Sequence, residues 1–310
     1  MTTQAEKQTF IFSAADDTQV YCHRWPLEKP TAIVQIVHGG AEHAGRYQGL
    51  AQALNARGYA VYAEDHRGHG RTGEINTSLG DMGAANAFER VCDDVLALGS
   101  RAKTEYPGIP LIIIGHSLGS LIVQRILLQH SHEYAAAVLS GSPDITGIAA
   151  GAELVHAEVD RVGRGQVSDA LEAAAVGTLA AAIPNAETPY DWLSRDRQQV
   201  QLHADDPWCG YALCAGVWQD LIAAMLVTTE VSAVAATLRR DMPIYIISGS
   251  DDPAHGNWAA IDRLARNYRE CGLRYVTVKN YPGGRHEMFN EINRDEVVAE
   301  LLEWLDSQMS

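Results

Sequence analysis

The strongest candidate for chemistry is a serine between glycines, in the sequence Gly115-His116-Ser117-Leu118-Gly119. An apolar run at 111–114 precedes it, and an apolar helical stretch begins at Leu118. A serine on a sharp turn between a strand and a helix has strained backbone angles and needs glycines on both sides. Its hydroxyl is then exposed above the strand end, beside a helix N-terminus that favours developing negative charge. The pattern therefore predicts that Ser117 is a nucleophile.

A serine is a weak nucleophile unless a base accepts its proton and an acid orients that base. In a parallel sheet with such a turn, the acid and then the histidine follow later strands. Asp251 and Asp252 come after an expected strand at 244–247, and His286 comes after one at 273–278. We expect Asp252 to be the acid, because the proline after it stiffens its turn, with Asp251 as the alternative. The expected base is His286.

Acyl transfer also needs backbone N–H donors for the oxyanion that develops in the transition state. The N–H of Leu118, directly after the serine, is the first candidate. The second is expected from the Gly-rich loop after a strand at 32–37, where we assign it to Gly40, with Ala41 as the alternative. Three residues that follow either orient this loop or form a plain ion-pair network: Glu42, His43 and Arg46.

Apolar runs alternate with helical patterns along the first half of the chain. Strands are expected at 32–37, 59–63, 111–114 and 136–139, and helices at 47–57, 88–104 and 118–129. Such alternation is typical of a mostly parallel sheet with helices on both faces. Two short strands, at 9–12 and 19–22, come before it, and the pattern resumes from residue 243 to a helix at 295–309. The predicted fold class is therefore α/β.

The strand pattern is interrupted between residues 141 and 242 by a stretch rich in alanine and other helix formers, including expected helices at 169–182 and 211–228. A crossover between parallel strands needs only about 30 residues. We therefore expect a helical cap inserted at 143–239, with an α/β core formed by 1–142 and 240–310. Three aromatic residues of this cap either line a substrate pocket or belong to the core of the cap: Trp208, Tyr211 and Trp218.

The composition of the 310-residue chain is acidic, with 24 Lys+Arg, 39 Asp+Glu and a net charge of −15. Nucleic-acid binding needs clustered basic residues, so the composition argues against it. It also disfavours docking to anionic lipid headgroups by charge. No apolar run approaches the roughly 20 residues of a transmembrane helix, and residues 1–7 lack the pattern of a signal peptide. Five scattered cysteines without a CxxC pair favour a reduced, cytoplasmic setting.

Two other patterns bear on cofactors. The sequence Gly68-His69-Gly70-Arg71-Thr72-Gly73 matches the GxGxxG of dinucleotide sites, but the polar residues 74–83 that follow do not favour a helix. We interpret 64–85 as a loop that lines the core. Twelve histidines are present, without an HExxH motif or a Cys/His set. We therefore expect neither a cofactor nor a metal.

Four segments together resemble the α/β-hydrolase superfamily, and more narrowly its monoacylglycerol lipase and lysophospholipase branch, which is grouped with serine aminopeptidase-like hydrolases. These segments are 38–47, 65–70, 115–119 and 281–287. The most specific is 38–47, with the sequence HGGAEHAGRY, because GxSxG alone indicates only the superfamily. The resemblance covers roughly 10–142 and 240–310, and 192–196 and 206–210 of the cap also resemble bacterial members.

The resemblance implies a serine hydrolase of carboxylic esters, with Ser117 as nucleophile, Asp252 as acid and His286 as base. It places Gly40 and Leu118 at the oxyanion hole and an acyl-binding tunnel under the cap, and it implies no cofactor. The implied substrates are single-acyl lipids, such as monoacylglycerols or lysophospholipids, with transient membrane contact through the cap. Acyl-chain length, head group and oligomeric state remain open.

The residues leave two alternative functions. An amide or peptide hydrolase of the aminopeptidase-like kind would need an anionic pocket for a substrate amine, and Asp205 and Asp206 of the cap are candidates for it. The other alternative is a catalytically silent binding protein on the same fold. The complete set of serine, aspartate and histidine argues against a silent site.

Overall fold

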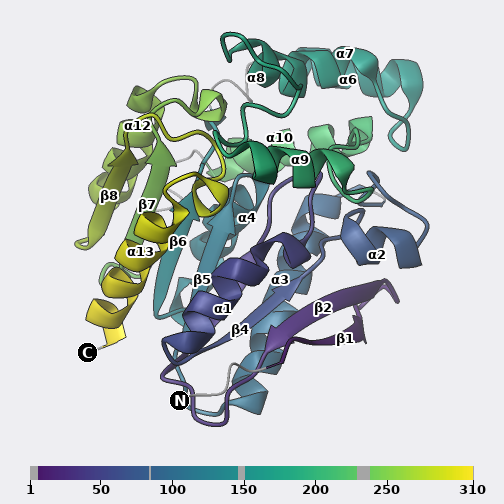
Figure 1. Cartoon of the computed structure of the whole chain (residues 1–310). Coiled ribbons are helices and arrows are strands. Elements are labelled where there is room, and N and C mark those ends of the chain that lie inside the picture. Colours follow the sequence, from purple (N-terminus) through teal and green to yellow (C-terminus); the bar gives the residue numbers. More distant parts are fainter. Residues whose placement is uncertain (1–5, 84, 146–150, 229–237, 310) are drawn as a thin grey trace.

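An eight-stranded, mostly parallel sheet forms the centre of the protein (Figure 1). It is seen in a computed structural model that describes residues 6–83, 85–145, 151–228 and 238–309. The strand order is β1-β2-β4-β3-β5-β6-β7-β8; β1 pairs antiparallel with β2 and β2 with β4, whereas the other pairs are parallel. The strands are β1 (Gln8–Ser13), β2 (Gln19–Trp25), β3 (Ala32–Val37), β4 (Tyr59–Glu64), β5 (Leu111–His116), β6 (Ala136–Ser140), β7 (Ile244–Gly249) and β8 (Val276–Tyr281). Residues 1–5, which carry part of the signal-peptide expectation, lie outside the described residues.

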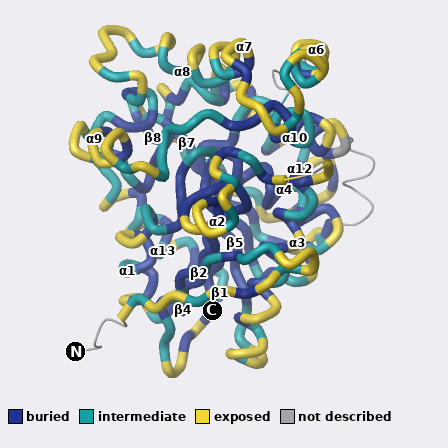
Figure 2. Tube along the Cα trace, turned by 90° about the vertical axis from the view of Figure 1, so that its right-hand side faces the viewer, coloured by how far each residue is buried: buried dark blue, intermediate teal, exposed yellow. Residues whose placement is uncertain are grey.

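Helices cover both faces of the sheet, and their apolar sides bury the central strands. Every residue of β3 to β7 is buried, as expected of parallel strands covered on both sides. Successive residues of β5 face opposite layers: Ile113 packs in the cluster with α3 and α4, and Ile112 packs in the cluster with α1 and α13. Figure 2 shows this buried centre in dark blue. The helices of these layers are α1 (Gln48–Ala56), α3 (Ala87–Glu105), α4 (Leu118–His130), α12 (Trp258–Glu270) and α13 (Arg294–Met309).

The observed sheet confirms the predicted α/β class. Between β6 and β7 the described residues form helices joined by loops, with one isolated bridge between Val167 and Cys214 and no strand. The helices are α6 (Ala152–Val162), α7 (Asp169–Glu172), α8 (Thr178–Ala181), α9 (Arg197–Asp205) and α10 (Ala215–Thr228). In Figure 1, α6, α7 and α8 lie at the top, farthest from the sheet. None of the described helices is long and apolar enough to cross a membrane.

The predicted cap at 143–239 includes these helices, and its residues 146–150 and 229–237 lie outside the described part of the chain. The helix expected at 169–182 is interrupted by a π-helical turn, η3 (Ala173–Gly177). The helix expected at 211–228 begins later, at Ala215. The exact division into core and cap remains a prediction.

Two segments of the core differ from the sequence-based expectation. The expected loop at 64–85 contains a short helix, α2 (Gly70–Ile75). Its first turn is held by Asp65, whose carboxylate accepts the N–H groups of Arg71 at 2.8 Å and Ala44 at 2.9 Å. Strand β8 begins at Val276 rather than at residue 273, because Val276 is the residue that pairs with the start of β7. Both differences arise from contacts between distant segments, which local composition does not reveal.

Candidate active site

Ser117 lies on the turn between β5 and α4, with backbone angles φ 51° and ψ −119°. A positive φ is uncommon for a residue with a side chain and indicates local strain. The flanking glycines are required because the two elements approach closely. A Cβ at Gly115 would collide with the carbonyl oxygen of Gly119, and a Cβ at Gly119 would collide with that of Val37. The turn brings Ser117 to the wall of a cavity.

His286 lines the same cavity from the loop after β8, and Asp252 supports it from the loop after β7. The Nδ1 atom of His286 lies 3.0 Å from Oδ2 of Asp252, and the two side chains are 2% and 0% exposed. Asp251, the alternative acid, is exposed, and its Oδ1 accepts the hydroxyl of Ser250 at 2.8 Å. The structure thus brings Asp252 rather than Asp251 into contact with His286.

The charges of this pair stabilise each other. Burial alone would lower the pKa of His286, but the Asp252 carboxylate outweighs burial and raises it. Burial alone would raise the pKa of Asp252, but His286 outweighs burial and lowers it. The imidazole also packs against His116 and Trp192, with ring centroids 4.7 and 4.8 Å away. A buried imidazole whose cationic form is stabilised in this way is suited to accept a proton from a hydroxyl group.

The loop after β3 brings Gly40 next to Leu118. A Cβ at Gly40 would lie 3.6 Å from Cδ2 of Leu118, and both residues line the cavity with Ser117. Among the described residues, neither N–H group donates to a protein acceptor. Ala41, the alternative donor, has φ 51°, and its carbonyl oxygen accepts the N–H of Gly210 at 2.9 Å. The arrangement leaves the N–H groups of Gly40 and Leu118 available to an oxyanion formed at Ser117.

The cavity has a volume of about 630 Å³, within the range typical of small-molecule sites. Its lining is mostly apolar and comes from α4 and from helices between β6 and β7: Leu121, Leu154, Val155, Leu171, Val217 and Leu221. Polar residues also line it, among them four with a carboxylate: Glu42, Asp144, Glu172 and Glu287. Sequence reasoning proposed none of the residues of α6 and α7, because alanine-rich helices carry no signal that separates pocket-facing from core-facing positions.

Tyr211 and Trp218 line the cavity, but Trp208 lies outside it, contrary to the expectation from sequence. The guanidinium of Arg71 lies 4.3 Å from the centre of the Trp208 ring, and the ring of His43 lies 5.6 Å from it. Trp208 is held there because its segment docks against the loop after β3. The hydroxyl of Tyr211 and the indole N–H of Trp218 are buried without a protein partner among the described residues.

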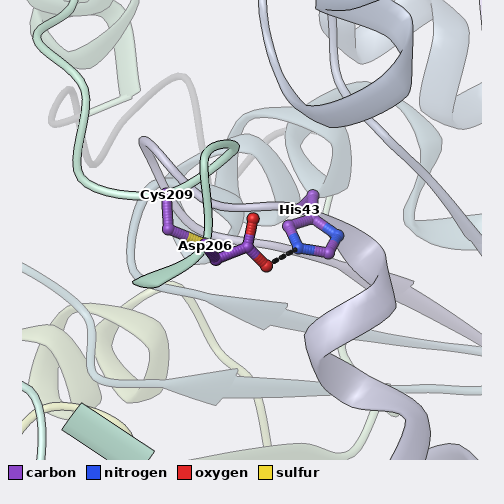
Figure 3. Close-up of side chains that lie close together, drawn as sticks. All are labelled: His43, Asp206 and Cys209. Atoms are coloured by element: carbon purple, nitrogen blue, oxygen red, sulfur yellow. Dashed lines mark hydrogen bonds and ion pairs between the residues drawn. The ribbon is translucent and has the colours of Figure 1, made fainter. Parts of the chain in front are cut away.

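His43 lies close to Asp206 and Cys209, which belong to the same segment as Trp208 (Figure 3). Their potential metal-ligand atoms lie within 4.8 Å of one another. However, Nδ1 of His43 accepts the N–H of Gly45 at 3.2 Å, so the neutral ring carries its proton on Nε2 and donates it to Asp206 at 2.9 Å. Burial raises the pKa of the Cys209 thiol and keeps it protonated. These contacts describe a hydrogen-bonded link between Asp206 and the residues after β3.

Comparisons with known proteins agree with this geometry. The chain matches the family described as "Serine aminopeptidase, S33" over residues 28–293. It is 31% identical over 306 residues to a monoacylglycerol lipase of Mycolicibacterium smegmatis, covering 96% of each chain. It is 28% identical to the human monoglyceride lipase, covering 90% of this chain and 87% of that one. A thermostable carboxyl esterase from Bacillus coagulans, solved in complex with glycerol, superposes with a TM-score of 0.90 at 27% identity, covering 99% of this chain and 100% of that one.

Proposed function

This chain belongs to the serine aminopeptidase S33 family of α/β-hydrolases, and we propose that Ser117, Asp252 and His286 are the catalytic triad with which it hydrolyses carboxylic esters. One observation carries the assignment: the imidazole that Asp252 holds at 3.0 Å lines the same cavity as the strained Ser117. Serine, acid and base also follow their strands in the order that this architecture requires.

The reaction follows from the position of each group. His286 accepts the proton of Ser117 while the serine oxygen attacks the ester carbonyl, and the N–H groups of Gly40 and Leu118 bind the oxyanion. The imidazolium then gives its proton to the leaving alcohol, and an acyl-enzyme remains. Water attacks this ester with His286 again as the base, and the imidazolium returns the proton to the Ser117 oxygen as the carboxylic acid is released. Asp252 holds the required tautomer and stabilises the imidazolium.

The proposed substrates are single-acyl lipids, monoacylglycerols or lysophospholipids. A largely apolar cavity that Ser117 lines suits one extended acyl chain. The relatives named above are monoacylglycerol lipases, and the similar carboxyl esterase was solved with glycerol.

Location and surface contacts are also proposals. We place the enzyme in the cytoplasm, because all five cysteines are free thiols. We further propose that residues 143–239 act as the cap and make transient contact with lipid surfaces. Large apolar side chains exposed on this region support that contact: Leu154, Val167 and Leu202.

The aminopeptidase-like alternative has less support. The carboxylate of Asp206 is engaged by His43 and by the N–H of Trp208 at 2.9 Å. Asp205 is exposed and accepts the amide of Gln201 at 2.7 Å. Neither aspartate lines the cavity, so neither is placed to bind the amine of a substrate held at Ser117.

The decisive experiment compares acyl esters, monoacylglycerols and aminoacyl amides as substrates of the parent protein and of Ser117→Ala. We expect the parent to prefer esters and to react with a fluorophosphonate probe. The variant should lose at least about 10⁴-fold in kcat and should not be labelled. Equal ester hydrolysis by the two proteins would refute the triad, and a preference for aminoacyl amides would refute the ester assignment.

A further inference from the structure

A buried ion network connects the loop of Gly40 to the loop of His286. Arg46 donates to Oε2 of Glu42 at 2.6 Å and binds both carboxylate oxygens of Glu287, at 2.5 and 2.7 Å. The side chains of Arg46, Glu42 and Glu287 are only 10%, 4% and 6% exposed. Glu287 directly follows His286 in the chain. One guanidinium group therefore contacts both loops that the reaction uses.

Glu42 fixes the backbone beside the proposed oxyanion donor. Its Oε1 accepts the N–H of Gly39 at 2.6 Å and the hydroxyl of Tyr47 at 2.7 Å. The N–H of Gly39 is therefore occupied, and the chain entering Gly40 is held in one orientation. Arg46 binds the other oxygen of the same carboxylate, so it determines where this anchor lies.

The network also acts on His286 through charge. Burial alone would raise the pKa of Glu42 and of Glu287, but Arg46 outweighs burial and keeps both carboxylates ionised. Two carboxylates against one guanidinium leave the network negative. Burial lowers the pKa of His286, and Asp252 raises it. The next contributions come from Glu287 and Glu42, and both raise this pKa. The ring of His116 is the other titratable group packed on His286.

We propose that Arg46 is a positioning residue that holds the oxyanion loop and the loop of His286 together by binding Glu42 and Glu287 at the same time. This inference rests on the function proposed above. Arg46 does not line the cavity, so it acts through its two partners rather than by touching the substrate. The planar fork of an arginine can bind two carboxylates in fixed directions, which the point charge of a lysine cannot do.

The first test measures kcat and KM of Arg46→Gln and Arg46→Lys with a short-chain ester. Small misplacements of catalytic groups cost up to about 10²-fold in rate, so we expect that order of loss in kcat for Arg46→Gln, with KM changed less than about threefold. Arg46→Lys keeps the charge without the fork and should recover part of the rate. Fluorophosphonate labelling of Ser117 should slow in parallel, because it uses the same groups.

Arg67 provides a matched control. Its side chain is 7% exposed and also binds two carboxylates, Asp94 at 2.5 Å and Asp16 at 2.6 Å, but it does not line the cavity. Arg67→Gln should lower the free energy of unfolding while kcat per active site stays within about twofold of the parent. An equal loss of kcat in Arg67→Gln and Arg46→Gln would contradict a specific positioning role.

The second test reads the pH dependence of kcat/KM in Glu287→Gln. This variant keeps the shape of the side chain and removes a negative charge that favours the imidazolium of His286. The acid limb should therefore move to lower pH, whereas a purely structural role would leave it in place.

If Arg46→Gln does not fold, the triple variant Glu42→Gln/Arg46→Met/Glu287→Gln removes all three charges and leaves no unpaired buried ion. It should show the same loss of kcat.

The outcomes separate the two proposals. Suppose that the parent hydrolyses esters through Ser117. The positioning role would then be overturned if Arg46→Gln or the triple variant kept the kcat of the parent and Glu287→Gln kept its acid limb. A parent protein without ester hydrolysis would instead overturn the proposed function.

Discussion

The Nδ1 atom of His286 and the Oδ2 atom of Asp252 are 3.0 Å apart in a site shielded from solvent. Asp252 is held in this position because it begins a short helical turn, η4 (Pro253–His255), where its Oδ1 accepts the N–H of Ala254 at 2.8 Å. The neighbouring Asp251 is exposed. Two adjacent aspartates thus differ in environment, and only the buried one can stabilise the imidazolium.

This difference gives a paired test of the triad acid. We expect Asp252→Asn to lower kcat by about 10⁴-fold, because the amide would favour the wrong tautomer of His286. Asp251→Asn should change kcat less than about twofold. Steady-state hydrolysis of a chromogenic ester measures both. A larger loss in Asp251→Asn than in Asp252→Asn would reverse the assignment.

The pH dependence of the reaction follows from the same pair. Asp252 outweighs burial and raises the pKa of His286 above its ordinary value of 6.5. The imidazole must be neutral to accept the proton of Ser117, so kcat/KM should fall as the pH falls through this raised pKa. We therefore expect the acid limb above pH 6.5 in a profile of kcat/KM against pH. An acid limb below pH 6.5 would contradict this electrostatic description.

The cavity predicts how activity depends on acyl-chain length. Val217 on α10 lines the cavity and is 4% exposed, so a tryptophan there would fill space that a long chain needs. Val217→Trp should lower kcat/KM for a palmitoyl ester at least about tenfold, with less than about threefold change for an acetyl ester.

Leu226 is the matched control for the cavity test, because it lies on the same helix but is 48% exposed. Leu226→Trp should leave the ratio of palmitoyl to acetyl activity within about twofold of the parent. If Val217→Trp also leaves that ratio unchanged, the acyl chain binds elsewhere.

The turn at Ser117 predicts a contrast between two glycines. Gly119→Ala would drive a Cβ into the carbonyl oxygen of Val37, so we expect it to lose about 3 kcal/mol or more in the free energy of unfolding. At Gly49 in α1 a Cβ would meet nothing within 4 Å, and Gly49→Ala should gain about 0.5–1 kcal/mol. Urea unfolding of both variants measures these changes. Equal stability of the two variants would show that the turn tolerates a side chain.

The amino-acid sequence by itself determined the features that depend on near neighbours. The apolar run before Ser117, the glycines around it and the helix after it predict the turn, because strand, turn and helix each depend on a few adjacent residues. The same holds for the order in which Ser117, Asp252 and His286 follow their strands. The α/β class could be predicted for the same reason, since the alternation of strands and helices is a repeated local pattern.

The tertiary structure decided the features that depend on how distant segments meet. Trp208 lies outside the cavity because its segment docks on the residues after β3. Asp252 rather than Asp251 reaches His286 because the loops after β7 and β8 lie side by side. Arg46 and Glu287 are 241 residues apart in the chain and meet only when the sheet has brought their loops together. No local pattern encodes such contacts, because their free energy arises from burial and charge pairing that exist only in the folded protein.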